Sequence, residues 1–249
     1  LLFAPLVRCL PARRKAILSQ HQYTRAERLR VAFLGGAYNS AVGRVHRVAV
    51  EMDHRFELVG GCFSRHPEAN RDTAIQYGLD PAQVSASLDE LLDRRAGDID
   101  ALVVLTPTNQ HEQQVLRCLG AGLPVICEKA LATTSAEALA IHRQLAGQGG
   151  FLAVTYNYTG YPMLRELRQM VADSRFGKIE QIHVEMPQDG FARFSGDGSP
   201  LVPQDWRLRD GRVPTISLDL GVHLHMMVRF LTDERPVEVV ATSATYGNF

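Results

Sequence analysis

Short apolar runs alternate with helix-like stretches along the sequence between residues 29 and 156. Apolar runs of roughly four to eight residues that end at Gly or Pro are typical of buried strands. Strands that alternate with helices predict a parallel sheet with helices on both faces, which is an α/β fold. The predicted strands span 29–34, 56–63, 99–105, 124–127 and 151–156, and the predicted helices span 43–52, 67–78, 88–92, 109–119 and 135–146.

The pattern changes after residue 157. Helices are predicted over 162–172 and 219–230, alternating strands over 178–186 and 237–245, and a Gly- and Pro-rich loop over 188–214. We therefore predict a first domain over 29–156 and a partial second domain over 157–249. Residues 1–28 form an extension that is apolar first and basic second, the wrong order for a signal peptide. Either the N-terminus is truncated or mis-assigned, or the extension is a helix that covers the surface.

Composition excludes several classes of partner. The 249 residues carry no formal net charge, so the basic excess that nucleic acid or an anionic membrane requires is missing. No apolar run reaches the roughly 18–20 residues of a membrane span. The four cysteines show neither metal-finger nor CxxC spacing, so we expect buried thiols, a cytoplasmic protein and no metal site.

A glycine-containing turn follows the first predicted strand. Glycines between a strand and a helix let backbone N–H groups approach a pyrophosphate, which the helix N-terminus also favours. The spacing departs from G-x-G-x-x-G, with Ala37 and Asn39 where glycine is expected, although Asn39 tolerates a positive φ. A plain strand–helix turn therefore remains an alternative. The residues predicted to bind a dinucleotide here are Gly35, Gly36, Ala37, Asn39, Ala41, Val42 and Gly43.

The end of the second predicted strand bears on the choice of dinucleotide. An acidic residue at this point would bind the ribose 2′-hydroxyl of NAD, and none is present. Ser64 and Arg65 offer instead a hydroxyl and a cation to a 2′-phosphate. We expect NAD or NADP, with a lean towards NADP; a solvated arginine on a turn is the alternative reading.

Four further segments carry a family resemblance. Together with the glycine turn, their order and spacing resemble the glucose–fructose oxidoreductase, inositol dehydrogenase and rhizopine-catabolism oxidoreductase family (Gfo/Idh/MocA), over about residues 29–249. The segments are Leu105–His111 (LTPTNQH), Val125–Leu131 (VICEKAL), Asn157–Met163 (NYTGYPM) and Asp219–His223 (DLGVH).

The resemblance implies a Rossmann domain, a doubly wound parallel sheet, followed by an α+β domain with an open, mostly antiparallel sheet. It places Thr106, Pro107, Asn109 and His111 beside the nicotinamide, Glu128 on the cofactor side, and Lys129 in the active site. Ala130 stands where the family has proline, which could loosen the backbone that aims Lys129. The second domain is incomplete here, and the full-length protein is expected to form a homo-oligomer.

Lys129, Asp219 and His223 are the predicted catalytic residues. Oxidation of a hydroxyl removes a hydride and a proton, so the protein must supply a base. Residues four apart share a helix face, so His223 can act as acid/base while Asp219 orients it and Lys129 polarises the oxygen. The alternatives are an exposed ion pair and a surface lysine. A zinc site that adds His225 is not expected.

Aromatic and polar residues of the second domain could shape a pocket for a sugar. We predict substrate contacts from Asn157, Tyr158, Trp206 and Arg207, with core or interface packing as the alternative for the rings.

Three functions follow from these residues. The first is an NAD(P)-dependent dehydrogenase acting on a CH–OH group of a sugar, cyclitol or related polyol. The second is redox-assisted elimination or hydrolysis on a sugar with a retained cofactor. The third is a non-catalytic nucleotide-binding sensor, or an inactive fragment.

Overall fold

A computed structural model describes residues 28–244, and the chain divides into two compact units at Thr155/Tyr156. The N-terminal unit extends to Thr155, and the C-terminal unit begins at Tyr156. The predicted extension over 1–28 lies outside the described residues except for Arg28.

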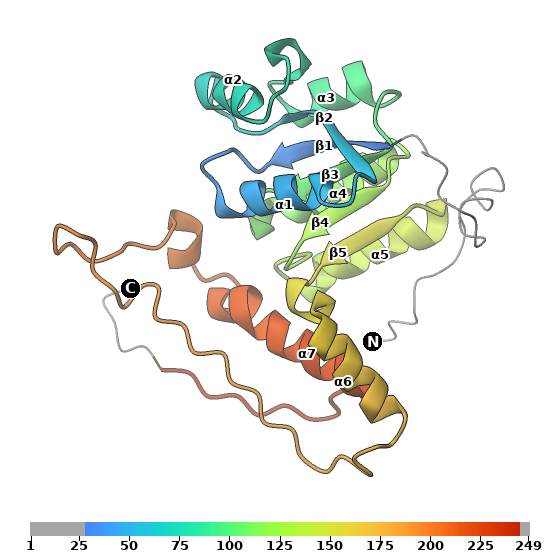
Figure 1. Ribbon diagram of the computed structural model, residues 1–249, viewed down its shortest axis with the longest axis vertical. Coiled ribbons are helices and arrows are strands. Elements are labelled where there is room, and N and C mark those ends of the chain that lie inside the picture. Colours follow the sequence, from blue (N-terminus) through green and yellow to red (C-terminus); the bar gives the residue numbers. More distant parts are fainter. Residues whose placement is uncertain (1–27, 245–249) are drawn as a thin grey trace. The chain divides into compact units, whose positions relative to one another are not determined.

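The N-terminal unit is built on one parallel sheet with the strand order β2-β1-β3-β4-β5 (Figure 1). Consecutive residues in the middle of β1 and β3 are buried, as expected for strands that are covered on both faces. The predicted parallel, doubly wound sheet is therefore confirmed. The strands are β1 (Leu29–Gly35), β2 (Phe56–Cys62), β3 (Ala101–Leu105), β4 (Val125–Glu128) and β5 (Leu152–Thr155).

Helices cover both faces of this sheet. One core cluster joins the sheet to α3, α4 and α5 through residues such as Leu91, Val115 and Ile141. A second cluster joins the other face to α1 and α2 through Val50 and Ala74. The bounds are α1 (Ala41–Glu51), α2 (Pro67–Gln76), α3 (Leu88–Arg95), α4 (His111–Gly120) and α5 (Ser135–Gln148), with short 3₁₀ turns η2 (Pro81–Gln83) and η3 (Thr108–Gln110).

Side chains that cap helices fix where several of them begin. Ser87 Oγ accepts from the backbone N–H of Glu90 at 3.1 Å and starts α3. Thr134 Oγ1 accepts from the N–H of Glu137 at 3.3 Å and starts α5.

The C-terminal unit contains two packed helices joined by long irregular segments. Helices α6 (Pro162–Ala172) and α7 (Val222–Thr232) lie side by side, and the Arg168 guanidinium sits 4.6 Å from the centroid of the Phe230 ring. The remaining elements are the 3₁₀ turns η4 (Asn157–Gly160) and η5 (Asp205–Leu208) and the π-helical turn η6 (Ser217–Gly221), which leads directly into α7.

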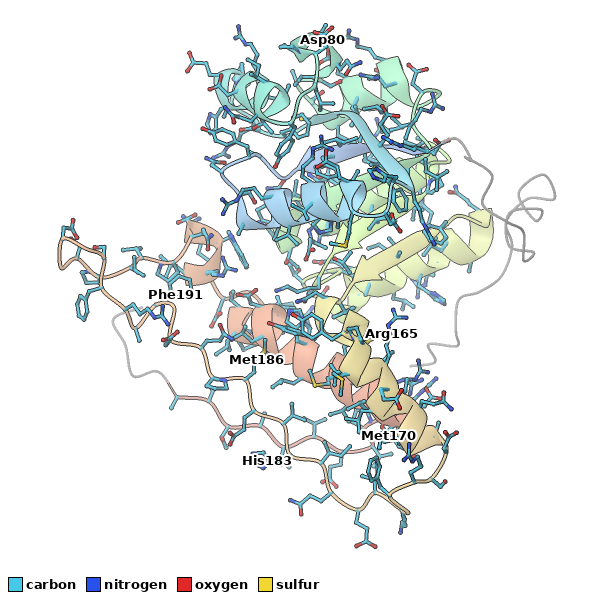
Figure 2. All side chains as sticks on the ribbon, viewed as in Figure 1. Asp80, Arg165, Met170, His183, Met186 and Phe191 are labelled. Atoms are coloured by element: carbon cyan, nitrogen blue, oxygen red, sulfur yellow. The ribbon has the colours of Figure 1, made fainter. Side chains whose placement is uncertain are left out.

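The strand predictions for the C-terminal unit are wrong over the described residues. Residues 178–186 and 237–244 form no strand, and Figure 2 shows His183 and Met186 on an irregular trace. Alternating polarity selects a face, but a strand also needs a neighbour for its backbone hydrogen bonds. Ile182, Val237 and Val239 are accordingly exposed. The antiparallel sheet that the resemblance implies is not formed within residues 156–244.

The cysteines that the structure describes are buried and in no disulfide, as expected: Cys62, Cys118 and Cys127. Burial raises the pKa of the Cys118 thiol to about 12 and raises that of Cys127 as well. Helices long and apolar enough to cross a membrane do not occur between residues 28 and 244.

Candidate cofactor site and catalytic residues

The glycine turn lies where the strand order reverses, between the carboxyl ends of β1 and β3. Gly35 and Gly36 have φ of +80° and +72°, a region that side chains rarely adopt. A Cβ on Gly36 would lie 2.5 Å from Leu105 Cδ1, and one on Gly43 would lie 2.2 Å from the Gly36 carbonyl oxygen. Each of these glycines is therefore required by space, by backbone conformation, or by both. Ligands of open α/β sheets bind at this kind of switch point.

Helix α1 begins directly behind the turn. Ser40 caps it by accepting from the Gly43 N–H at 3.4 Å, and the Tyr77 hydroxyl donates to the Gly36 carbonyl at 3.0 Å. Asn39 lies in the turn that the Ser40 N–H closes onto the Ala37 carbonyl oxygen at 2.8 Å, but it does so without a positive φ, which Gly35 and Gly36 adopt instead. The other predicted turn residues are in place, with Ala37 half-buried and Asn39, Ala41 and Val42 exposed.

Ser64 and Arg65 follow the end of β2, on the same edge of the sheet. Ser64 Oγ accepts from the His66 N–H at 3.1 Å, and Arg65 is exposed. The carbonyl oxygen of the Asn70 side chain accepts from the Phe63 and Ser64 N–H groups at 2.8 and 3.3 Å, which fixes this turn. The edge therefore presents a hydroxyl and a cation where an acidic residue would favour NAD.

The loop after β3 holds Thr106, Pro107, Asn109 and His111. Thr106 Oγ1 donates to the Gln114 side chain at 2.5 Å; Pro107 is half-buried and Asn109 is exposed. His111 is fully buried, and its ring nitrogens lie 2.7 Å from the carbonyl oxygens of Ala130 and Thr106. The resemblance placed His111 among the residues beside the cofactor. Complete burial leaves its ring no exposed atom, so we assign it to the support of the loops instead.

Glu128 ends β4 and receives hydrogen bonds from three directions. His46 Nε2 lies 2.7 Å from Oε1, Thr155 Oγ1 donates to Oε1 at 2.9 Å, and the Lys129 N–H donates to Oε2 at 3.1 Å. Burial alone would raise the pKa of Glu128, but the hydrogen bonds from His46, Thr155 and the Lys129 N–H outweigh it and lower the pKa. Glu128 is thus a partly buried carboxylate that stays ionised.

Lys129 itself is half-buried, and the Lys129–Ala130 peptide is cis. The two residues that flank it both have fixed partners: Glu128 through its carboxylate and Ala130 through its carbonyl oxygen.

In the C-terminal unit, His223 stands on the first turn of α7 and is 7% exposed. Its ring packs edge-on against Tyr158 and Tyr156, at centroid distances of 4.8 and 6.1 Å. Asp219 lies in the π-helical turn before α7 and accepts a hydrogen bond from Arg207 Nε at 2.9 Å, in a half-buried ion pair. The structure thus brings together two pairs of predicted residues, His223 with Tyr158 and Asp219 with Arg207.

The remaining predicted substrate residues are Trp206 and Asn157. The Arg207 guanidinium lies 4.2 Å from the centroid of the Trp206 ring. Asn157 is exposed in η4.

Among residues 28–244, no group of three or more His, Cys, Asp or Glu side chains is arranged to hold a metal ion.

Sequence reasoning missed His46, Thr155 and Tyr156. A signal for His46 was available, because Gly43, His46 and Val50 are spaced three and four apart and so share one helix face. Gly43 and Val50 are buried, so that face points inward and carries His46 with it. The partner of His46 could not be found in this way, since Glu128 is distant in sequence.

Comparison with known proteins agrees with this geometry. Residues 29–156 match the oxidoreductase family with an NAD-binding Rossmann fold (Gfo/Idh/MocA), and residues 164–248 match a Gfo/Idh/MocA C-terminal domain. The chain belongs to the Gfo/Idh/MocA oxidoreductase family.

Several relatives are inositol dehydrogenases or their homologues. An inositol 2-dehydrogenase of Rhizobium meliloti is 30% identical over 82% of this chain and 56% of its own length. The structure of an inositol dehydrogenase homologue from Azotobacter vinelandii, complexed with NADH and myo-inositol, has 30% identity and a TM-score of 0.73, over 84% of this chain and 54% of that one. An NADP⁺-dependent scyllo-inositol 2-dehydrogenase of Bacillus subtilis is 24% identical over 80% of this chain and 51% of its own. The chain thus spans about half the length of these relatives.

Proposed function

We propose that this chain carries the cofactor-binding unit and catalytic residues of an NAD(P)-dependent dehydrogenase that oxidises a CH–OH group of a cyclitol, sugar or related polyol. The observation that carries the proposal is the turn of Gly35, Gly36 and Gly43 at the β1/β3 switch point, with the N-terminus of α1 behind it. The three glycines leave the backbone open to close approach, and the helix N-terminus favours phosphate.

The residues around this turn fit a dinucleotide. The N–H groups of residues 36–43 would meet the pyrophosphate, while Ser64 and Arg65 would meet the ribose that carries the adenine. Because they provide a hydroxyl and a cation without a carboxylate, we propose that NADP is bound in preference to NAD. The NADP⁺-dependent relative shows that this preference occurs in the family.

The preference is testable with one pair of variants. Arg65→Ala should weaken NADPH binding about 10-fold or more, because a charged hydrogen bond is lost, and should leave NADH nearly unchanged. Arg71→Ala, an exposed arginine of α2, is the matched control. Equal NADH and NADPH affinity in the unmodified chain, with no effect of Arg65→Ala, would remove the case for NADP.

The chemistry divides among three side chains. A bound nicotinamide would supply the acceptor for the hydride that leaves the carbinol carbon. Lys129 donates to the hydroxyl oxygen and stabilises its developing negative charge. His223 accepts the proton; its ring lies against the edges of two tyrosines, which limits the orientations it can take. Asp219 orients the site as a carboxylate and is itself held by Arg207.

The substrate class and the cellular setting follow from the relatives and from the side chains. A ring with several hydroxyls suits the polar and aromatic residues Asn157, Tyr158, Trp206 and Arg207, and the inositol dehydrogenases among the relatives act on such rings. We further propose that the full-length protein is cytoplasmic, since its described cysteines are buried and form no disulfide, and that it is a homo-oligomer.

Turnover separates the alternatives. Purified chain is incubated with NAD⁺ or NADP⁺ and with myo-inositol, scyllo-inositol or glucose, and reduced cofactor is followed by absorbance. The proposal predicts turnover that Lys129→Ala and His223→Ala each lower by about 10²-fold or more. Cofactor that co-purifies without net reduction would indicate the retained-cofactor chemistry. Cofactor binding without turnover, unchanged in both variants, would indicate a sensor.

A further inference from the structure

Two histidines approach the segment Glu128–Ala130 from different helices of the N-terminal unit. His46 lies on α1, the helix that follows the glycine turn, and its Nε2 is 2.7 Å from Glu128 Oε1. Both side chains are about five-sixths buried, with exposed fractions of 15% and 17%. The pair therefore joins the helix behind the proposed pyrophosphate site to the residue before Lys129.

The Glu128 carboxylate connects His46 to the backbone of Lys129. Its Oε1 is shared by His46 and Thr155, and its Oε2 accepts from the Lys129 N–H at 3.1 Å. A carboxylate with hydrogen bonds on both oxygens keeps one orientation, because rotation would leave partly buried donors without acceptors.

His111 holds the other side of Lys129. Its Nδ1 lies 2.7 Å from the carbonyl oxygen of Ala130, and its Nε2 lies 2.7 Å from that of Thr106. A neutral ring has one N–H, so it donates to one carbonyl at a time, and only the protonated ring donates to both. With either nitrogen protonated, the ring lies between the residue after Lys129 and the loop that the family resemblance places beside the nicotinamide, and it bonds one of them directly.

We propose that His46 and His111 are positioning residues that fix the backbone on both sides of Lys129 and couple it to the two cofactor-binding loops. Neither residue is assigned to contact the substrate. The inference rests on the proposed function for the role of Lys129, but the two contacts themselves belong to the fold. A long lysine side chain aims its ammonium group accurately only when its backbone is held, and residues that support the ligands of metal sites in a comparable way are worth about 10–100-fold in activity.

The sequence makes Lys129 unusually easy to observe, because Lys15, Lys129 and Lys178 are its only lysines. Reductive methylation with ¹³C-formaldehyde keeps the charge and labels each lysine and the N-terminal amine. Lys129→Arg assigns the resonance by its disappearance, and Lys178 provides an internal reference in the same spectrum.

Two removals and two conservative replacements test the proposal. His46→Leu and His111→Leu should each move the Lys129 resonance towards that of an unstructured lysine and leave Lys178 unchanged. His46→Gln and His111→Asn, which keep an N–H donor near Nε2 and Nδ1 respectively, should restore most of the original position. His183→Leu, an exposed histidine of the C-terminal unit, should have no effect.

Glu128→Gln guards against loss of folding in the leucine variants. It keeps the size of the side chain and weakens the His46 contact, so it should move the Lys129 resonance as His46→Leu does. The double variant His46→Leu/Glu128→Gln should shift the resonance little further than either single variant, because both substitutions break the same His46–Glu128 contact. In the active enzyme the same variants should lower kcat by about 10–100-fold, with KM and the Kd for NADPH changed less than about threefold.

The outcomes separate this inference from the proposed function. A Lys129 resonance that stays in place in folded His46→Leu, His111→Leu and Glu128→Gln protein would overturn the positioning role, whatever the cofactor result. Additive shifts in the double variant would likewise overturn the connection through Glu128. A shifted resonance in a chain that binds neither cofactor would support the positioning role and contradict the proposed function.

Discussion

The two units of this chain differ sharply in how they bury apolar surface. In the N-terminal unit, buried hydrophobic residues run from Val31 to Leu145 and fill both sides of the sheet. Among residues 156–244, Thr215 and His223 are the buried side chains, and both are polar. The first unit therefore has a core of its own, while the second holds its predicted catalytic residues by local contacts.

This difference shows how the two halves of the predicted chemistry are supported. Lys129 follows a central strand, and its neighbours are fixed by side chains from β5, α1 and α4. His223 and Asp219 depend on two tyrosines and one arginine. Hydrophobic burial is the main stabilising term in folding, so we expect the cofactor unit to be the stable part of this chain.

Hydrogen exchange should give the largest contrast between the units. Amides in the paired, buried strands β1 and β3 are expected to exchange only through global opening, whereas residues 178–186 and 237–244 have no sheet partners. For a global stability of about 5 kcal/mol, exchange rates should differ by roughly 10³- to 10⁴-fold. Mass spectrometry of exchanged peptides measures this difference. Protection of 178–186 equal to that of β3 would show that the segment is paired in solution and would break the comparison.

Truncation of one apolar side chain in each unit sharpens the contrast. Leu102→Ala removes a fully buried residue of β3 and should lower the free energy of unfolding by about 2–5 kcal/mol. Val239→Ala removes a side chain that is 77% exposed and should change it by less than about 0.5 kcal/mol. Urea denaturation followed by fluorescence or circular dichroism checks both values. Similar costs for the two variants would mean that Val239 is buried in solution.

The glycine turn predicts a smaller, local effect on the cofactor. Gly43→Ala places a Cβ 2.2 Å from the Gly36 carbonyl oxygen, so the turn and the start of α1 must move apart. The Kd for NADPH or NADH should rise about 10-fold or more, since the backbone N–H groups lose their alignment. Gly97→Ala in the same unit meets no atom within 4 Å and is the control. Equal affinities of both variants would contradict the assignment of this turn to the pyrophosphate.

The dependence of stability on pH should be the smallest effect, and its sign follows from the buried groups. Burial lowers the pKa of His111 below its ordinary 6.5, despite the carbonyls of Thr106 and Ala130, so its contribution is complete above 6.5 and lost as pH falls through the lowered pKa. The pKa of Glu128 is also lowered, from 4.5, so its contribution is present above 4.5 and lost as pH falls further.

Unfolding free energies measured between pH 7 and pH 3 should therefore decline in two stages. His111→Asn should remove the stage that begins near 6.5, and Glu128→Gln the stage that begins near 4.5. A decline that is unchanged in both variants would show that other groups carry it.

The sequence predicted the N-terminal unit well because its elements are specified locally. Apolar runs, caps at Ser87 and Thr134, and glycines at the turn each act within a few residues. The strand predictions for the C-terminal unit failed because the alternating polarity around Ile182 and Val239 selects a face of a strand but does not supply a partner strand. The contacts of His46 and His111 could not be predicted from the sequence, because they join residues that are far apart in the chain.

The most direct test of the account is a pair of titrations of the purified chain, with NADPH and with NADH, followed by fluorescence or calorimetry. The account predicts micromolar binding of at least one cofactor, tighter for NADPH, by a chain whose β1 and β3 amides are far better protected from exchange than those of residues 178–186. Failure of folded protein to bind either cofactor would contradict the assignment of the glycine turn and, with it, the proposed dehydrogenase.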